Sequence, residues 1–272
     1  MKDFLIRQRK YTGVLFYAIF LFATHDLLPC EINNDIHLIN EMVDLQNRHP
    51  SEHVLIETNW MDQEKIAVSL GYNCIVAGQL SNEQIRHTAF PFDWCESHIE
   101  GLIRCINNDF KDFLSLENLI ADRDTRVHDC LYDIRIVHDF PFQRIENFKF
   151  DTMKQFYNFN SFGELVKSQY DETYSKLMRR VERFRNLSAF KGEIYFIRST
   201  DITKAQSLEL LEALNNSFKD KNFTLIVMNH ADEFKTPWNV PKIKNFFIDY
   251  KHIFCPFAKG LCTEFFKNSG MI

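Results

Sequence analysis

Glycine and proline are scarce in this chain of 272 residues, at 8 and 7 positions. Flexible linkers between domains are usually rich in one of these residues, so their scarcity indicates a compact chain with short loops. Long basic runs are also absent, because 32 Lys and Arg residues are spread among 37 Asp and Glu residues. Phosphate backbones are bound by concentrated positive charge, and we therefore expect no nucleic-acid partner.

The motifs of several common sites are missing. None of the seven cysteines has a second cysteine at the two-residue spacing of zinc knuckles and thioredoxin motifs. The sequence also lacks a Gly-rich phosphate loop, a Gly-x-Ser-x-Gly elbow and a His-Glu-x-x-His zinc helix. We therefore expect neither a metal nor a cofactor. In an exported protein, an odd number of cysteines leaves at least one without an intramolecular partner, and a nucleophile is a natural candidate.

The first thirty residues differ from the rest of the chain. A basic start, MKDFLIRQRK, precedes the apolar run YTGVLFYAIFLFAT at 11–24. This run has the length of a signal-peptide core and is short for a membrane span of about 20 residues. We interpret residues 1–30 as an export signal, cleaved or retained as a membrane anchor through 11–24, in an exported or membrane-anchored protein. The alternative is a buried N-terminal helix in a cytoplasmic protein.

The second half of the chain alternates strands and helices. A helix, a strand, an amphipathic helix and two more strands are expected at 162–187, 192–199, 202–218, 222–230 and 242–250. A strand–helix–strand series with a crossover of this length forms a parallel, right-handed unit. We therefore expect a single mixed α/β domain over residues 31–272, with a largely parallel sheet flanked by helices.

The first half is less regular. The apolar run KIAVSL at 65–70 is typical of a central strand. Apolar spacing elsewhere predicts further helices and strands: a helix over 31–49, a strand at 53–58, a helix over 75–90 interrupted at Ser81 and Asn82, a helix over 95–114 and a strand within 130–140.

Cys74 follows the strand at 65–70, where the helix at 75–90 is expected to begin. Free N–H groups and partial positive charge at a helix N-terminus stabilise a thiolate and can bind an oxyanion. Gly71 suits a sharp strand-to-helix corner that needs a positive φ. The side chain of Asn73 could donate a further hydrogen bond to the oxyanion. The alternative is an inert, buried cysteine at a structural corner.

A nucleophilic cysteine needs a nearby base and a group that orients this base. His138 is our first choice of base, because it lies at the end of a predicted strand and precedes Asp139. His128 stands in the same His-Asp dipeptide ten residues earlier and is the main competitor. Asp93 and Asp133 are alternatives to Asp139 for the orienting role.

The segment FPFDW at 90–94 is unusually aromatic for a surface turn. We expect its aromatic rings to pack against the sheet. Asp93 would then cap the helix expected to begin at Cys95 or point into a cleft. Asn73, Asp93 and Trp94 are the candidate substrate-binding residues.

A basic cluster, KLMRRVERFR at 176–185, lies within the helix expected over 162–187. Arg179 and Arg183 share one face of this helix. The cluster could bind an anionic group, although we expect a solvated helix face.

Six motifs occur in the order VSLGYNC, FPFDW, NDFKDFLSLENL, VHDF, RRVERF and IYFIRS, between about Val68 and Ser199. In this combination the sequence resembles a family of domains of unknown function labelled "putative papain-like cysteine peptidases". The resemblance implies Cys74 as the nucleophile and His138 as the base, with Asp139 beside it. It also implies a papain-like α+β fold as the alternative to a doubly wound one.

The leading hypothesis is a cysteine hydrolase, either a peptidase, an isopeptidase or an acyl transferase, that acts on a protein or peptide substrate. A second hypothesis is a glycosyltransferase-like or nucleotide-sugar-binding protein, with its ligand at the strand ends around Cys74, Asp93 and Arg198. The third is a non-catalytic, exported interaction module in which Cys74 is structural.

Overall fold

The computed structural model describes residues 59–121, 126–140, 166–230, 235–248 and 263–271. The expected export signal, the helix over 31–49 and the strand at 53–58 lie outside these residues. The helices and strands are β1 (Lys65–Ser69), α3 (Ile75–Asn82), β2 (Cys95–Ser97), α4 (Ile99–Asn107), β3 (Leu119–Ala121), β4 (Val127–Asp129), β5 (Ile134–Ile136), α7 (Tyr170–Asn186), β6 (Glu193–Ser199), α8 (Lys204–Ser217), β7 (Phe223–Asn229), β8 (Ile243–Phe247) and α10 (Thr263–Ser269), with short 3-10 turns at Trp60–Asp62, Leu116–Asn118 and Leu187–Ala189.

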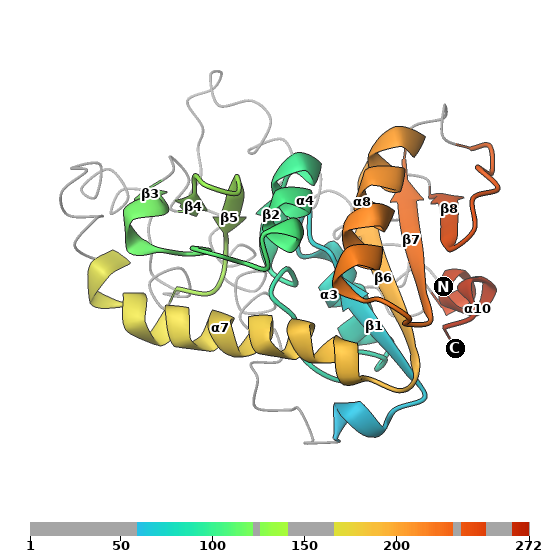
Figure 1. Cartoon of the computed structure of the whole chain (residues 1–272), viewed down its shortest axis with the longest axis horizontal. Helices are drawn as coiled ribbons and strands as arrows, with labels where there is room; N and C mark the ends of the chain where they lie inside the picture. The colour runs from blue at the N-terminus through green and yellow to red at the C-terminus, as the bar shows by residue number, and fades with distance from the viewer. Residues whose placement is uncertain (1–58, 122–125, 141–165, 231–234, 249–262, 272) are drawn as a thin grey trace, which may run out of the picture. The chain divides into compact units, whose positions relative to one another are not determined.

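Four of the strands form a parallel sheet, sheet A, in the order β1-β6-β7-β8 (Figure 1). The series β6-α8-β7 is the parallel unit that the sequence predicts. Helix α8 begins at a capping box, in which the Thr203 side chain accepts from the Gln206 N–H and the Gln206 side chain accepts from the Thr203 N–H. The expectation of an α/β fold with a largely parallel sheet flanked by helices is confirmed.

The other four strands form an antiparallel sheet, sheet B, in the order β2-β5-β4-β3. Each of these strands has only three residues. The expectation of one helix over 95–114 is wrong at both ends, because Cys95–Ser97 is strand β2 and helix α4 runs only from Ile99 to Asn107. The helix expected over 75–90 ends at Asn82.

Residues of β1 alternate between two hydrophobic clusters on the two faces of sheet A. Ile66 and Val68 belong to a large cluster that also contains residues of α4, α7, α8 and sheet B. Ala67 belongs to a smaller cluster with Val76 of α3 and Phe266 of α10. Helix α3 therefore covers the face of sheet A opposite to α8, and its N-terminus lies at the carboxyl end of β1.

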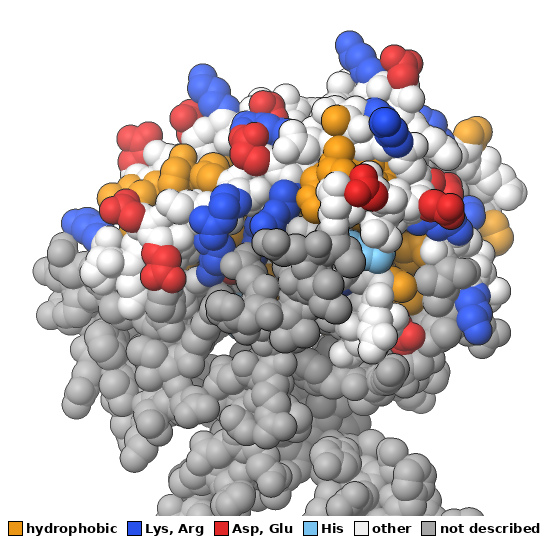
Figure 2. Space-filling view, turned by 90° about the horizontal axis from the view of Figure 1, so that it is seen from below, with side chains coloured by type: hydrophobic (Ala, Val, Ile, Leu, Met, Phe, Trp, Pro, Cys, Tyr) orange, Lys and Arg blue, Asp and Glu red, His pale blue; other side chains and the backbone are white. Residues whose placement is uncertain are grey.

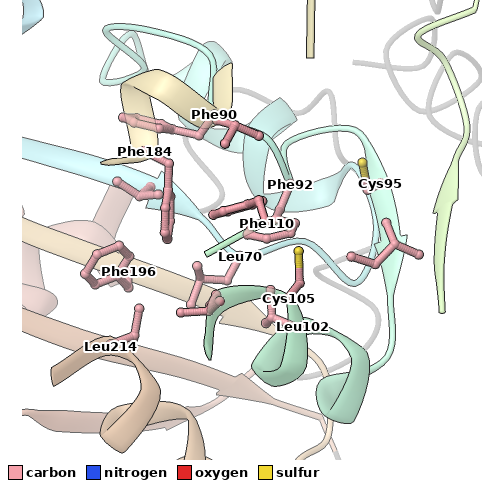
Figure 3. Close-up of a cluster of buried hydrophobic side chains, with 14 of the residues drawn as sticks. Leu70, Phe90, Phe92, Cys95, Leu102, Cys105, Phe110, Phe184, Phe196 and Leu214 are labelled. Atoms are coloured by element: carbon pink, nitrogen blue, oxygen red, sulfur yellow. The ribbon is translucent and has the colours of Figure 1, made fainter. Parts of the chain in front are cut away.

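Helix α7 joins the two sheets through the large cluster. The ring of Phe184 contacts Phe92, Phe110, Phe196 and Phe218, which come from the loop before β2, the loop after α4, β6 and the end of α8. Figure 3 shows Phe92, Phe110, Phe184 and Phe196 gathered around Leu70, whereas Cys95 lies at the edge of the cluster. The end of β1, which leads to Cys74, is thus anchored in the large hydrophobic cluster.

Figure 2 views the molecule from the side on which α7 lies in Figure 1. Acidic and basic side chains are interspersed on this face, with apolar side chains between them. The basic cluster of α7 is not the solvated face that we expected, because Arg180 is buried and Lys176 and Arg183 are half-buried. Arg185 is also half-buried, so Arg179 is the one exposed member of the five basic residues at 176–185.

Candidate functional site

Cys74 lies at a corner between β1 and α3, at the N-cap position of the helix. Two consecutive residues before it, Gly71 and Tyr72, have positive φ angles of 74° and 77°. A positive φ is uncommon for a residue with a side chain, and for a bulky one it marks a backbone that its surroundings hold in place. The expectation of a positive φ at Gly71 is confirmed, and Tyr72 extends the strained turn by one residue.

Hydrogen bonds of polar side chains fix both ends of this corner. The Ser69 hydroxyl accepts from the Gly71 N–H at 3.3 Å, and the Ser97 hydroxyl of β2 accepts from the Tyr72 N–H at 3.1 Å. Asn73 forms an Asx turn just before helix α3, because its Oδ1 accepts from the Ile75 N–H at 2.9 Å. Its Nδ2 group makes no hydrogen bond with the described residues, so it is the part of Asn73 that can donate to a ligand.

The thiol of Cys74 is half-buried, and this burial raises its pKa above the ordinary value. The residue's own backbone N–H lowers the pKa, the negative charge of Glu96 raises it, and the positive charge of Arg126 lowers it. The raising effects prevail. This direction contradicts our expectation of enhanced thiolate character, because burial of the thiol outweighs the one backbone N–H, that of Cys74 itself, which favours the thiolate.

His138, the first candidate base, follows strand β5 by two residues and is half-buried. Its ring meets the ring of Trp94 edge to face, with 6.5 Å between the centroids. Strand β5 pairs directly with β2, whose last residue, Ser97, binds the corner of Cys74. The Cys74 thiol makes no hydrogen bond to a histidine in the described part of the chain, and catalytic hydrogen bonds in unliganded proteins are often long.

His128, the competing base, lies on β4, which is separated from β2 by β5. Neighbouring strands are about 4.8 Å apart, so His128 is about 10 Å from β2 in the sheet. Its Nε2 is bound to the Asp133 carboxylate at 2.8 Å, and His98 lies 3.8 Å from the same carboxylate. Asp133 thus belongs to a cluster with His128 and His98. Position in sheet B favours His138 over His128.

The carboxylate of Asp139 is buried and bound by helix α7. Lys176 lies 3.0 Å from Oδ1, and Arg180 donates to Oδ2 at 3.1 Å. Burial opposes the ionisation of Asp139, but the two cations outweigh it and lower the pKa of this carboxyl. Asp139 is therefore a buried anion that attaches α7 to the segment carrying His138.

Asp93 and Trp94 are buried beside Arg86. The Asp93 Oδ2 accepts from Arg86 Nη2 at 2.6 Å, from Arg86 Nε at 3.1 Å and from the Phe90 N–H at 3.1 Å. The Arg86 guanidinium also lies 5.4 Å from the centroid of the Trp94 ring. The expectation that Asp93 caps a helix beginning at Cys95 is wrong, because this carboxylate closes the loop before β2.

Residues 65–233 match the sequence profile of a protein family described as "Putative papain-like cysteine peptidase". The matched segment covers more than half of the chain and includes the corner of Cys74, sheet B and most of sheet A. The chain belongs to this family. The resemblance seen in the six sequence motifs is thereby confirmed, and the α/β fold is compatible with the papain-like family.

A relative of the chain is known from a giant virus. An uncharacterised protein of Acanthamoeba polyphaga mimivirus is 26% identical over 183 residues, which are 64% of this chain and 82% of the viral protein. No solved structure matches the chain. Membership of the papain-like family therefore rests on the sequence profile, and the viral relative adds similarity over the larger part of both chains.

No pattern in the sequence singles out Glu96, Ser97 and Arg126, which the structure brings close to the corner of Cys74. Arg198 is different, because it directly follows the apolar run IYFI at 194–197, and a charged residue next to such a run in a buried-type strand signals a special role. The structure buries Arg198 behind the corner, where it binds protein oxygens. The nucleotide-sugar hypothesis needed Asp93 and Arg198 as ligand-binding groups, and both are engaged by the protein itself.

The described residues contain no group of three or more His, Cys, Asp or Glu residues arranged to hold a metal ion. Within the same residues, no helix combines the length and the hydrophobicity needed to cross a membrane.

Proposed function

We propose that the protein is a cysteine hydrolase of the papain-like family in which Cys74 is the nucleophile and His138 the base. The observation that carries the proposal is the position of Cys74 at the start of α3, one residue after the two left-handed residues Gly71 and Tyr72. Strain of this kind concentrates at functional sites, where surrounding contacts maintain it. Membership of a family described as cysteine peptidases supports the same chemistry.

The proposed reaction is an acyl transfer through a thioester. His138 removes the proton from the Cys74 thiol while the sulfur attacks the carbonyl carbon of a peptide, isopeptide or ester. The Cys74 N–H and the Asn73 Nδ2 group hold the oxyanion of the tetrahedral intermediate. The imidazolium then gives its proton to the leaving amine or alcohol. Water, deprotonated by His138, attacks the thioester carbonyl and restores the free thiol.

The raised pKa of Cys74 makes the base necessary in this scheme. A thiol that is protonated at neutral pH reacts with a carbonyl only if its proton leaves as the carbon–sulfur bond forms. The base must approach the thiol when substrate is bound, since the two groups are not hydrogen-bonded in the resting protein. The proposal therefore predicts a strong dependence of Cys74 reactivity on one histidine.

The test is the rate of iodoacetamide alkylation of each cysteine in the folded protein between pH 6 and 9, followed by peptide mass spectrometry. His138→Ala and His128→Ala variants are measured in parallel, and hydrolysis of fluorogenic peptide and ester substrates is assayed with Cys74→Ala as the blank. The proposal expects slower Cys74 alkylation in His138→Ala, unchanged alkylation in His128→Ala and no hydrolysis by Cys74→Ala. Equal alkylation of Cys74 in both histidine variants, or hydrolysis that survives in Cys74→Ala, would refute it.

A further inference from the structure

Arg198 is the largest side chain of the described residues that is fully buried, with 1% of its surface exposed. It is the next-to-last residue of β6, the strand beside β1. Its guanidinium donates to the Leu70 carbonyl at 2.8 Å, to the Ser97 hydroxyl at 2.7 Å and to the Ser97 carbonyl at 2.6 Å. One side chain thus links the end of β1 to the end of β2.

No carboxylate among the described residues forms an ion pair with this guanidinium, and its Nε has no hydrogen-bond partner there. Arg86 and Arg180, the other buried or nearly buried arginines discussed above, each have a carboxylate partner. Burial lowers the pKa of Arg198 to about 9, so the side chain is still charged at neutral pH. Burying a cation among neutral partners costs free energy of folding. The fold nevertheless contains this cation at the position where it binds the corner of Cys74.

The hydroxyl of Ser97 transmits the position of Arg198 to the left-handed turn. It accepts from Arg198 and from the Tyr72 N–H, and it donates to the Leu70 carbonyl at 3.4 Å. Both lone pairs and the hydrogen of this hydroxyl are therefore used. The guanidinium also lies 5.6 Å from the centroid of the Tyr72 ring, within the range of a cation–π contact. Arg198 thus holds the Tyr72 backbone through the Ser97 hydroxyl and the Tyr72 ring through the cation–π contact.

We propose that Arg198 is a positioning residue for Cys74, which keeps the turn at Gly71 and Tyr72 in the conformation that presents the thiol and the first N–H groups of α3. The inference rests on the proposed function of Cys74. Arg198 does not contact the thiol, and its own donors face protein oxygens, so a role in binding an anionic ligand is not part of the proposal. The planar fork of arginine is required, because a lysine ammonium cannot bind both carbonyls and the hydroxyl while covering an aromatic ring.

The test compares Arg198→Lys with the unmodified protein by the pH profile of Cys74 alkylation. The Cys74 backbone N–H lowers the pKa of the thiol. Displacement of the turn weakens this contribution and should therefore raise the thiol pKa. We expect alkylation of Cys74 in Arg198→Lys to fall about tenfold at pH 8, with its profile moved to higher pH. Alkylation of Cys130, an exposed cysteine of the same chain, serves as the internal reference and should not change.

Two further variants separate positioning from general loss of stability. Leu214→Ala destabilises the core at α8, away from the corner, and should leave the pH profile of Cys74 unchanged. Ser97→Ala removes only the hydroxyl and keeps the two carbonyl contacts of Arg198, so it should move the profile in the same direction as Arg198→Lys by a smaller amount. Ser97→Ala also replaces Arg198→Lys as the test if the lysine variant does not fold.

The outcomes distinguish the inference from the function on which it rests. A reactive Cys74 whose profile is the same in Arg198→Lys, or in Ser97→Ala if the lysine variant does not fold, overturns the positioning role alone. The same shift in Leu214→Ala also overturns it, because stability would then explain the effect. A Cys74 that is unreactive in the unmodified folded protein overturns the proposed function, and the positioning role with it.

Discussion

Glu96 on β2 and Arg126, one residue before β4, form an ion pair beside the half-buried thiol of Cys74. The two charges act on the thiolate in opposite directions, because Glu96 raises the pKa of Cys74 and Arg126 lowers it. Glu96→Gln should therefore move the alkylation profile of Cys74 to lower pH, and Arg126→Gln should move it to higher pH. Alkylation rates measured across pH by peptide mass spectrometry check both signs.

The exposed Cys130 provides the control for these two variants. The pH profile of Cys130 alkylation should be the same in both variants as in the unmodified protein. This result would exclude a general effect of the altered net charge on the rate of alkylation. Shifts of the same sign in both variants would contradict the arrangement of charges around Cys74.

The ion pairs of Asp139 predict a pH-dependent contribution to stability. Asp139→Asn should lower the free energy of unfolding at pH 7 by about 3 kcal/mol, because it leaves Lys176 and Arg180 without their buried anion. The folded-state pKa of Asp139 lies below its unfolded value of about 3.9, so the stabilisation is complete above that pH and is lost as the pH falls through the folded pKa. The difference between variant and parent should thus narrow below about pH 4.

Urea unfolding at several pH values measures this difference. Glu182→Gln is the matched control, since it removes an exposed ion pair with Arg185 on the same helix and should cost less than about 1 kcal/mol. Similar losses of unfolding free energy in Asp139→Asn and Glu182→Gln would show that burial does not make the ion pairs of Asp139 more stabilising than an exposed pair.

The left-handed turn predicts a specific cost for a side chain at Gly71. A Cβ atom there would lie 2.7 Å from the Ser97 hydroxyl, and the residue has a φ of +74°. Gly71→Ala should lower the free energy of unfolding by about 2 kcal/mol, from the left-handed backbone and the displaced hydroxyl together. Gly270 has a φ of +85° but its nearest atom would be at 3.5 Å, so Gly270→Ala should cost only the backbone part, about 1 kcal/mol.

Thermal unfolding of the two glycine variants checks this prediction, and the difference between them measures the contacts of the added methyl group with Ser97 and with Phe92, which would lie at 3.2 Å. Equal losses of stability would mean that Ser97 moves away freely and does not hold the turn.

The cysteines of the described residues should react in a fixed order. Burial raises the pKa values of Cys95 and Cys105 well above the ordinary thiol value, and both lie in the core. Cys130 is exposed and Cys74 is half-buried. We expect Cys130 and Cys74 to be alkylated in the folded protein and Cys95 and Cys105 to be modified only in denaturant. Modification of Cys95 or Cys105 at the rate of Cys130 under native conditions would show that the core opens.

Sheet A could be predicted from the sequence because each of its longer strands is an apolar run that contrasts with the amphipathic pattern of α8. Sheet B could not, because strands of three residues are too short to show a period of two. At 95–107 the apolar residues of β2 and α4 follow one another at helical spacing, which explains why we expected one helix there. Only His98, in an extended conformation, separates the end of β2 from the start of α4, and no glycine or proline marks the change.

The candidate site was predictable where a local pattern carried it. Cys74 and Gly71 stand out because a strand, a glycine and a helix follow one another directly. The raised pKa of Cys74 and the pairing of Asp139 with Arg180 depend on segments far apart in the chain, and a single sequence does not show which segments meet. The same holds for Asp93, whose loop-closing bond to Arg86 replaced the expected helix cap.

The ring of Phe184 contacts residues from both halves of the molecule within one continuous hydrophobic cluster. Residues of sheets A and B share this cluster, so the two sheets should lose their structure in a single cooperative transition. A core mutation in the cluster then lowers the free energy of unfolding of the whole unit, while the corner of Cys74 keeps its geometry in the molecules that remain folded. A substitution far from the site can therefore abolish the function of Cys74 by raising the fraction of unfolded molecules. The sequence changes that the site tolerates accordingly depend on the whole core.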